Sequence, residues 1–141
     1  MQYSYAYEVT ISEQVVGYYM IYLRAINIDQ APSELSDYQS SIVHNCSAVH
    51  ISYIAVDKRF QKRSIGTNVL KTIIVQVLEI CKKFPITIIT LDALKDKYEW
   101  YKEIGFIAFD EEDIANSDIT IPMYINCILD KQAVNNYCNE I

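Results

Sequence analysis

Glycine is scarce in this chain, and its scarcity excludes the commonest nucleotide-binding loops. The 141 residues include only three glycines, at positions 17, 66 and 105, and each stands alone. A P-loop or a GxGxxG dinucleotide turn needs two or three glycines within one short window. The sequence therefore predicts no binding site of either type.

Patterns for metal binding and for a serine nucleophile are also missing. The four cysteines show no CxxC spacing, the two histidines show no ligand spacing, and no HExxH occurs. No serine stands in a nucleophile-elbow context. We predict no metal, buried and reduced thiols, and one loop and one strand histidine without a special role. The residues concerned are Cys46, Cys81, Cys127, Cys138, His44 and His50.

Signals for export or membrane insertion are absent from the sequence. The N-terminus has no basic region followed by an apolar one. The longest apolar stretches have the length of strands, short of the about 20 residues that a spanning helix needs. We expect a cytoplasmic protein with no membrane partner. The net charge of −6 also argues against general binding to nucleic acid.

The composition and the hydrophobic pattern together predict one α/β domain over residues 1–141. An apolar fraction of 51% is typical of a globular protein. Alternating and continuous apolar runs predict strands, and apolar residues at helical spacing predict helices. The expected strands are 3–11, 15–25, 48–56, 86–91, 106–109 and 120–129, and the expected helices are 64–81 and 97–104. A strand–helix–strand unit between antiparallel strands gives a mixed sheet.

Four segment boundaries complete this prediction. Residues 27–45 are polar and are expected to form a long loop, and residues 131–141 a frayed tail. Residues 110–118 are strongly acidic and are expected to form a surface loop. Asp96 is the expected N-cap of the second helix.

A basic turn interrupts this acidic chain directly after the third expected strand. It carries four cationic side chains, Lys58, Arg59, Lys62 and Arg63, and a helix begins immediately afterwards. A helix N-terminus offers unpaired N–H groups and the positive end of the helix dipole. The turn is therefore predicted to bind a phosphate-bearing ligand.

Two motifs in this region resemble a known family. Residues 61–66, Gln-Lys-Arg-Ser-Ile-Gly, resemble the Gln/Arg-x-x-Gly-x-Gly/Ala pyrophosphate signature of the GNAT superfamily of acyl-CoA-dependent N-acetyltransferases. Residues 98–106, Tyr-Glu-Trp-Tyr-Lys-Glu-Ile-Gly-Phe, resemble its aromatic-Tyr-x-x-x-Gly-Phe signature. Both motifs occur in order and in the expected strand and helix contexts, and the resemblance covers residues 15–129.

The resemblance implies a fold and a co-substrate. The implied GNAT fold is a mixed, mostly antiparallel twisted sheet with a central βαβ unit and helices on both faces. Family members usually begin with a strand and two helices before the region matched by residue 3 onward, so those N-terminal helices are expected to be missing here. The implied co-substrate is acetyl-CoA, with no metal.

The expected cofactor site combines the turn with the strand before it. Backbone N–H groups of about residues 62–67 would face the diphosphate, and Gly66 lacks a Cβ where the diphosphate approaches. Ser64 stands where the family usually has Gly, and we expect it to be helical, at little cost. The resemblance assigns the end of the strand to the pantetheine amides. The expected residues are Ile54, Ala55, Val56, Gln61, Lys62, Arg63, Ser64, Ile65, Gly66 and Thr67.

One catalytic role follows from the resemblance, and another stays open. Tyr101 matches the family tyrosine near the CoA sulfur, so it is expected to protonate the leaving thiolate. Trp100, Gly105 and Phe106 are expected to pack and cap. The group that takes the proton from the attacking amine is an ordered water or one of four carboxylates: Glu8, Glu34, Asp37 and Asp92.

Three functions remain in competition. The leading one is acetyl transfer from acetyl-CoA to a primary amine of unknown identity by direct attack. Residues 55–61, 91–94 and 121–123 resemble the toxin branch of the family, which acetylates the amino acid on charged tRNA. The basic clusters at 58–63 and 95–102 favour that version, and the net charge of −6 counts against it. The alternative of another class is a non-catalytic module that binds CoA or a protein, and two exposed strand surfaces indicate a homodimer.

Overall fold

Six strands form one mixed sheet in the order β1-β2-β3-β4-β6-β5. The structure is a computed structural model that describes residues 4–27, 45–84 and 86–127. The strands are β1 (Tyr5–Ile11), β2 (Gln14–Asn27), β3 (Asn45–Val56), β4 (Ile88–Leu94), β5 (Ile107–Ala108) and β6 (Thr120–Asn126). The helices are α1 (Ile65–Cys81), α2 (Tyr98–Ile104) and α3 (Glu111–Asn116), with short 3-10 helices η3 (Lys58–Phe60) and η4 (Lys95–Lys97).

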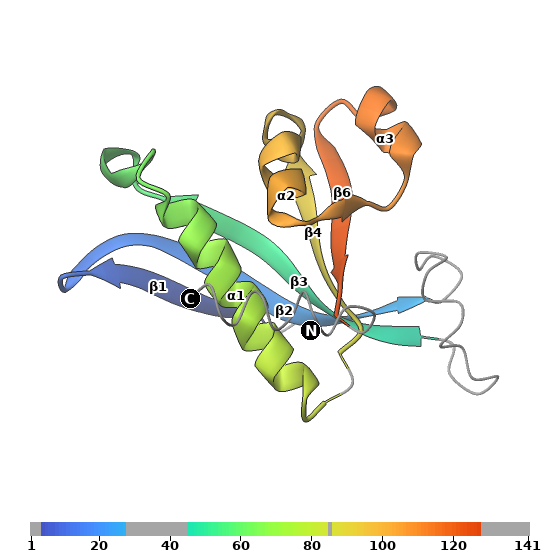
Figure 1. The fold of residues 1–141 in the computed structure, drawn as a ribbon, viewed down its shortest axis with the longest axis horizontal. Helices are drawn as coiled ribbons and strands as arrows, with labels where there is room; N and C mark the ends of the chain where they lie inside the picture. The colour runs from blue at the N-terminus through green and yellow to red at the C-terminus, as the bar shows by residue number, and fades with distance from the viewer. Residues whose placement is uncertain (1–3, 28–44, 85, 128–141) are drawn as a thin grey trace.

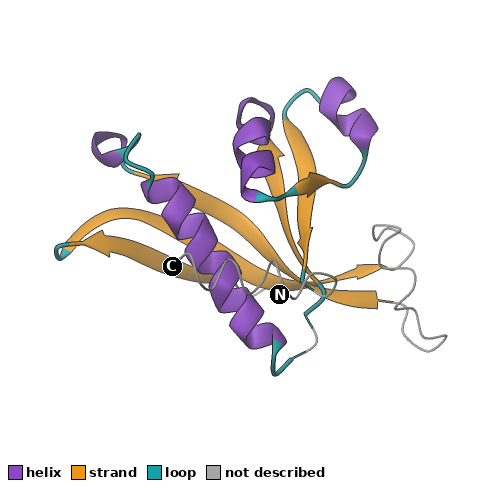
Figure 2. Ribbon diagram, viewed as in Figure 1, coloured by secondary structure: helices purple, strands orange, loops and turns teal. Residues whose placement is uncertain are grey.

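The sheet has a single parallel pair, at its centre. Strands β1, β2 and β3 pair antiparallel, as do β4, β6 and β5. Strands β3 and β4 are parallel, and α1 connects them. The predicted mixed α/β sheet with a central βαβ unit is therefore confirmed. Figure 2 shows α1 as the long helix lying across strands β1 to β3.

The parallel pair holds together over only part of its length. Its ladder runs from Ala48 opposite Ile88 to Ile51 opposite Leu91. Strand β3 then continues to Val56 and β4 to Leu94, and Figure 1 shows the two strands diverging from this point. The divergence opens the middle of the sheet at the carboxyl ends of both strands.

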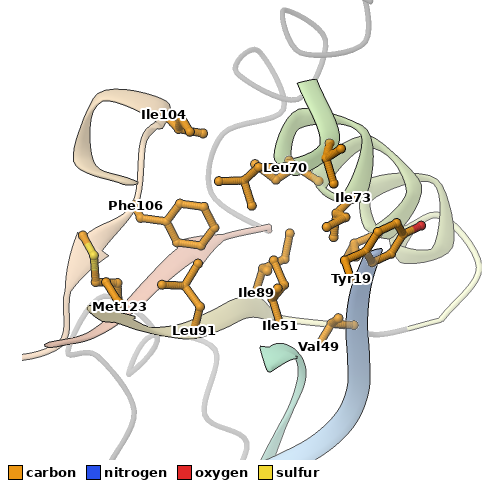
Figure 3. Packing of buried hydrophobic residues seen from close by; sticks show 14 of the residues in the cluster. Tyr19, Val49, Ile51, Leu70, Ile73, Ile89, Leu91, Ile104, Phe106 and Met123 are labelled. Carbon is orange, nitrogen blue, oxygen red and sulfur yellow. The ribbon is translucent and has the colours of Figure 1, made fainter. Parts of the chain in front are cut away.

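One hydrophobic core joins α1, α2 and the sheet. The apolar stripe of α1 is buried, with Leu70, Ile73 and Ile74 fully shielded from solvent. Figure 3 shows Leu70 and Ile73 facing Ile89 of β4. Burying a side chain of this size stabilises the fold by about 1.5–3 kcal/mol. This packing fixes the N-terminus of α1 relative to the end of β3.

The sequence of α2 determines how the chain returns to the core. The helix ends at Gly105, whose φ of 121° is readily adopted only by glycine. Phe106 follows and is 1% exposed. Figure 3 shows its ring within the same core. The expected packing and capping roles of these two residues are thus confirmed.

The predictions for the acidic segment and for the N-cap of α2 are wrong. The acidic segment 110–118 is not a plain loop, because α3 forms within it. The Asp110 carboxylate accepts a hydrogen bond from Glu112 N at 2.9 Å, and acidic residues suit the positive end of the helix dipole. Asp96 is not an N-cap, since it lies inside η4 and the N-cap of α2 is Lys97.

Other expectations shift or lie beyond the described residues. Strand β4 begins and ends later than the predicted strand 86–91. The expected loop lies, apart from its two end residues, outside the described residues, and the expected tail lies wholly outside them. Within the described part, no helix combines the length and the apolar character that crossing a bilayer requires.

Candidate functional site

The last residues of β3 have an unpaired edge inside the sheet. Ile54, Ala55 and Val56 pair on one side with Tyr19, Tyr18 and Gly17 of β2. On the other side, the ladder to β4 has already ended at Ile51 and Leu91. The groups that face away from β2 are those of Ile54 and Val56, because Asp57 N bonds to Val16 O and the pairing alternates along the strand. Apart from Val56 O, which accepts a hydrogen bond from Gln61 Nε2, such edge groups can pair with an added, extended segment. The family resemblance assigned this end of the strand to the pantetheine amides, and the structure leaves its outer edge open.

The turn after β3 is fixed by its own side chains. The Asp57 carboxylate accepts a hydrogen bond from Arg59 N at 2.9 Å and another from Arg59 Nη2 at 2.8 Å. The Arg59 side chain, and then its backbone N–H, hold the pKa of Asp57 at about 2. Gln61 Nε2 donates to Val56 O at 2.8 Å and ties the turn to the strand. The charge of Arg59 is therefore balanced locally.

The remaining cations of the turn face solvent. Lys58, Lys62 and Arg63 are all exposed. The Arg63 guanidinium lies 5.6 Å from the centre of the Phe60 ring, a distance at which cation–π attraction operates. The turn therefore keeps a net positive charge after the Asp57–Arg59 pair is discounted.

Ser64 is not helical, contrary to expectation. It has φ 59° and ψ 14°, the left-handed region, and it is the N-cap of α1 without a side-chain capping hydrogen bond. Lys62 is also left-handed, with φ 62°. For a non-glycine residue this conformation costs about 1–2 kcal/mol. Where left-handed residues alternate with right-handed ones, successive backbone N–H groups point into one concavity. Such a concavity, called a nest, binds anions.

The first turn of α1 supplies further unpaired donors. Its first backbone hydrogen bond runs from Asn68 N to Ser64 O at 3.0 Å. The N–H groups of Ile65, Gly66 and Thr67 precede it, so they have no acceptor within the helix. They project from the N-terminus of this 17-residue helix, which is the positive end of its dipole. An anion is favoured at this position.

Trp100 links α2 to this helix start, a contact that sequence reasoning missed. Its indole Nε1 donates to Thr67 Oγ1 at 3.0 Å. A Cβ added to Gly66 would lie 3.6 Å from the Trp100 ring, an ordinary van der Waals distance. The protein itself therefore leaves room for a methyl group at position 66. The packing role expected for Trp100 is confirmed, but no pattern in the sequence indicates the hydrogen bond.

Tyr101 is half-buried on α2, beside the same core. Its ring centre lies 4.6 Å from that of Trp100 and 5.9 Å from that of Phe106. Burial raises the pKa of Tyr101 above its usual value, so the phenol stays protonated at neutral pH. Among the described residues, no group forms a hydrogen bond with its hydroxyl. This phenol is thus available as a proton donor to a bound molecule.

The four candidate carboxylates lie in different places. Glu8 lies on β1, where it lines a cavity of 340 Å³ together with Tyr19 and Ile65. Asp92 directly follows the last residue of the parallel ladder, Leu91, so it lies where β3 and β4 separate. Glu34 and Asp37 are outside the described residues. Asp92 alone among those described stands at the divergence.

The cysteines and histidines form no cluster of metal-binding type in the described ranges. No group of three or more His, Cys, Asp or Glu side chains there lies close enough to hold a metal ion. Cys46, Cys81 and Cys127 are free thiols and half-buried rather than fully buried. His50 is a strand histidine, as expected, but it is buried in a polar cluster that the sequence did not reveal. His44 and Cys138 are outside the described residues.

Comparison with known proteins supplies a family and a set of structural neighbours. The family model for the acetyltransferase (GNAT) domain matches residues 37–127. A search of curated proteins finds no match to the chain.

Three solved structures illustrate the likeness. A "bacterial toxin" has 19% identity and a TM-score of 0.72, over 92% of this chain and 68% of that one. AtaT complexed with acetyl-methionyl-tRNAfMet has 19% identity and a TM-score of 0.68, over 89% and 71%. AtaTR bound with AcCoA has 19% identity and a TM-score of 0.68, over 96% and 73%. At such identities the likeness establishes the fold.

Proposed function

The chain belongs to the GNAT acetyltransferase family, and we propose that it transfers an acetyl group from acetyl-CoA to a primary amine by direct attack. One observation carries this proposal above the others. The unpaired edge of β3 leads directly into a basic turn and the N-terminus of α1. An elongated molecule with a diphosphate in its middle fits that sequence of groups.

Acetyl-CoA would use three parts of the site in turn. Its pantetheine amides would pair with the open edge of Ile54, Ala55 and Val56, as an added strand does. Its diphosphate would take the unpaired N–H groups of the first turn of α1. Its thioester would then reach the point where β3 and β4 separate. A related structure, AtaTR, is bound with AcCoA.

The diphosphate site has both neutral and charged donors. Lys62 and Arg63 are exposed cations beside the left-handed turn. Ser64 has no capping hydrogen bond, so its hydroxyl is available to a phosphate oxygen. Gln61 acts differently from the direct ligand that its motif implies, because its side chain holds Val56 O. The remaining proposed contacts are Ile65, Gly66 and Thr67, through their N–H groups.

Tyr101 is the proposed general acid. As the tetrahedral intermediate collapses, its phenol would give a proton to the CoA thiolate. The burial that raises its pKa keeps this proton in place until the sulfur leaves. The ring contact of Tyr101 with Trp100, whose indole donates to Thr67 at the start of α1, supports this role.

A thermal shift assay with acetyl-CoA tests the binding step. A ligand at one hundred times its Kd stabilises the folded state by about 2.7 kcal/mol, so the melting temperature should rise. Pantetheine, which lacks the diphosphate, is the matched control and should produce a smaller rise in melting temperature. A melting temperature that stays constant up to millimolar acetyl-CoA would contradict the proposed binding of acetyl-CoA and, with it, the proposed reaction.

A second candidate is the toxin-type reaction, in which the amine belongs to an aminoacyl-tRNA. It is favoured by the fold shared with AtaT complexed with acetyl-methionyl-tRNAfMet. Exposed Lys58 and Lys62 follow β3, and exposed Lys95 and Lys97 follow β4, so both sets lie at the same end of the parallel pair. Incubation with acetyl-CoA and methionyl-tRNA should then yield N-acetylated product, and expression should arrest growth. Absence of both effects excludes this version.

The remaining alternatives have simple readouts. A non-catalytic module would bind acetyl-CoA, yet release no CoA thiol with polyamines, peptides, amino acids or charged tRNA. A homodimer stays a prediction, which sedimentation of the purified chain would check. AtaT has been seen bound to its antitoxin AtaR, so an antitoxin partner belongs only to the toxin version.

A further inference from the structure

Asp92 lies on the face of the sheet opposite α1. Along β4, Ile89, Leu91 and Ala93 belong to the core that α1 covers. Side chains alternate between faces along a strand, so Thr90 and Asp92 point the other way. The Asp92 side chain is 54% exposed, and its residue is the first beyond the parallel ladder. A carboxylate is thus accessible from solvent at the opening between β3 and β4.

A buried histidine supports this carboxylate from within the sheet. His50 of β3 has a side chain only 6% exposed, and its Nε2 lies 3.7 Å from Asp92 Oδ2. Its other nitrogen, Nδ1, lies 2.8 Å from Thr90 Oγ1 and 3.4 Å from Arg24 Nη1. The Tyr22 ring covers the imidazole at a centroid distance of 5.0 Å. Groups from the two neighbouring strands, β2 and β4, therefore hold this ring in place.

The neighbours of His50 also determine where its proton lies. An arginine only donates hydrogen bonds, so Nδ1 beside Arg24 is the acceptor nitrogen. The ring proton is then on Nε2, which faces Asp92. Burial lowers the pKa of His50, Asp92 raises it and Arg24 lowers it, which leaves the ring neutral near pH 7. At 3.7 Å the N–H lies beyond hydrogen-bond distance, so it attracts the carboxylate as a dipole and leaves the negative charge of Asp92 uncancelled.

We propose that Asp92 is the catalytic base of acetyl transfer and that His50 is the residue that positions it. The assignment rests on the proposed function, because it concerns the proton of the attacking amine. The proposed acid, Tyr101, packs with the core on the α1 side, whereas Asp92 is on the opposite face. The amine and the leaving thiolate would then be served by two separate groups, one on each face of the sheet at the opening, so that neither group has to act as both base and acid.

The protons of the reaction balance with these two groups. The acceptor arrives as an ammonium, and Asp92 takes one of its three protons, which later passes to solvent through the exposed carboxyl. The free amine attacks the thioester carbonyl, so an N–C bond forms and the C–S bond breaks. Tyr101 gives its proton to the sulfur and recovers one from the nitrogen. The products are the amide with one N–H, the CoA thiol and one released proton.

Three variants separate a base from a passive surface charge. Asp92→Asn keeps the shape but not the basicity, Asp92→Glu keeps the basicity, and Asp96→Asn removes an exposed carboxylate from the neighbouring η4 as the matched control. The probes are acetyl-CoA with spermidine and acetyl-CoA with methionyl-tRNA. Asp92→Asn should lower kcat about 10²- to 10⁴-fold. Its melting temperature and its affinity for acetyl-CoA should stay at wild-type values.

The controls make each result decisive. Asp96→Asn should keep wild-type kcat, and Asp92→Glu should retain more activity than Asp92→Asn. Equal kcat for Asp92→Asn and wild type, with either probe, overturns the assignment while leaving the proposed function intact. A wild type that binds acetyl-CoA but acetylates neither probe overturns the proposed function and this assignment with it. A wild type that does not bind acetyl-CoA also overturns both, because the binding step precedes the chemistry.

The role of His50 requires a coupled test. His50→Gln retains an N–H donor and His50→Ala does not, so the glutamine variant should keep the higher kcat per folded molecule. In the Asp92→Asn background, neither substitution should lower kcat further, because a positioning residue acts through its partner. A purely structural histidine would instead lower the melting temperature and leave kcat unchanged. That pattern would remove His50 from the mechanism.

Discussion

At the scale of single residues, Ser64 combines strain with a functional position. Its left-handed conformation is one that glycine adopts freely, and its hydroxyl forms no capping hydrogen bond. Strained residues persist where the surrounding structure determines them, and they are common at ligand sites. The serine hydroxyl is the feature that distinguishes this turn from a glycine turn.

Ser64→Gly should therefore stabilise the protein without ligand. Relief of the left-handed strain exceeds the extra chain entropy of glycine, which gives a gain of up to about 1 kcal/mol in the free energy of unfolding. Ser64→Ala keeps the Cβ and should leave that stability unchanged, because no capping bond is lost. Urea unfolding measures both values. A Ser64→Gly protein less stable than wild type would show that the turn is not strained.

Gly66 separates the demands of the fold from those of the ligand. An added Cβ meets the Trp100 ring only at ordinary contact distance, and alanine favours a helix over glycine by about 1 kcal/mol. Gly66→Ala should therefore keep or raise the melting temperature of the free protein. Its affinity for acetyl-CoA should fall about tenfold, equivalent to about 1.4 kcal/mol, since the methyl group adds bulk to the first turn of α1, whose N–H groups are proposed to bind the diphosphate. Calorimetric titration that returns the wild-type Kd would contradict the proposed path.

Tyr101 gives the clearest dependence on pH. Its protonated form is the active one, and burial raises its pKa above the ordinary value of about 10. The kcat of the wild type should therefore hold from neutral pH up to at least that value and decline only beyond it. Tyr101→Phe should lower kcat about 10²-fold with an unchanged melting temperature. A decline of wild-type kcat that is centred near pH 8 would assign the acid to another group.

At the scale of elements, strands β2 and β3 form the support of the cofactor edge. Gly17 of β2 packs so closely against Ala55 that an added Cβ would clash with the Ala55 carbonyl oxygen. A backbone atom cannot move aside as a flexible side chain does. The position of the open edge at 54–56 thus depends on a glycine in the neighbouring strand.

Gly17→Ala should disturb both the fold and the site. Overpacking of this kind costs about 1–3 kcal/mol, and the shift of β3 should weaken binding of acetyl-CoA. Val16→Ala, which instead removes atoms from a fully buried side chain of the same strand, is the matched control for stability loss alone. Comparison of Kd at equal fraction folded separates the two effects. Equal affinities would mean that the edge of β3 does not bind the cofactor.

The helices differ in how well the sequence predicted them. The stripe of α1 and the glycine stop of α2 were predictable, because their signals are local and periodic. Helix α3 was missed because an acidic run reads as a solvated loop, whereas Asp110 caps it and the dipole favours its charges.

Contacts between distant elements were out of reach for a different reason. The hydrogen bond from Trp100 to Thr67 spans 33 positions, and the contact of His50 with Thr90 spans 40. Neither pair leaves a local pattern. The left-handed conformation of Ser64 was also unpredictable. The family motif usually has glycine at this position, and a serine in its place suggests an ordinary right-handed conformation instead.

At the scale of the whole molecule, the proposed cofactor site and the two proposed catalytic residues gather at the opening between β3 and β4. The sheet is continuous except where β3 and β4 part, and the basic turn, the start of α1, Tyr101 and Asp92 are all in elements that border or follow this point. An overall charge of −6 is compatible with it, because the positive charge is local. The net charge therefore argues against general binding to nucleic acid, but it does not argue against binding of acetyl-CoA in the local basic turn.

Amide hydrogen exchange with and without acetyl-CoA tests this account most directly. The unpaired N–H groups at the end of β3 and in the first turn of α1 should become protected together when the ligand binds. The amides of Ile54 and Val56 and those at 65–67 should slow, while the Ala55 amide, which faces β2, and those in α3 (Glu111–Asn116) should stay unchanged. Saturating acetyl-CoA that leaves exchange at Ile54, Val56 and 65–67 unaltered would contradict the central claim.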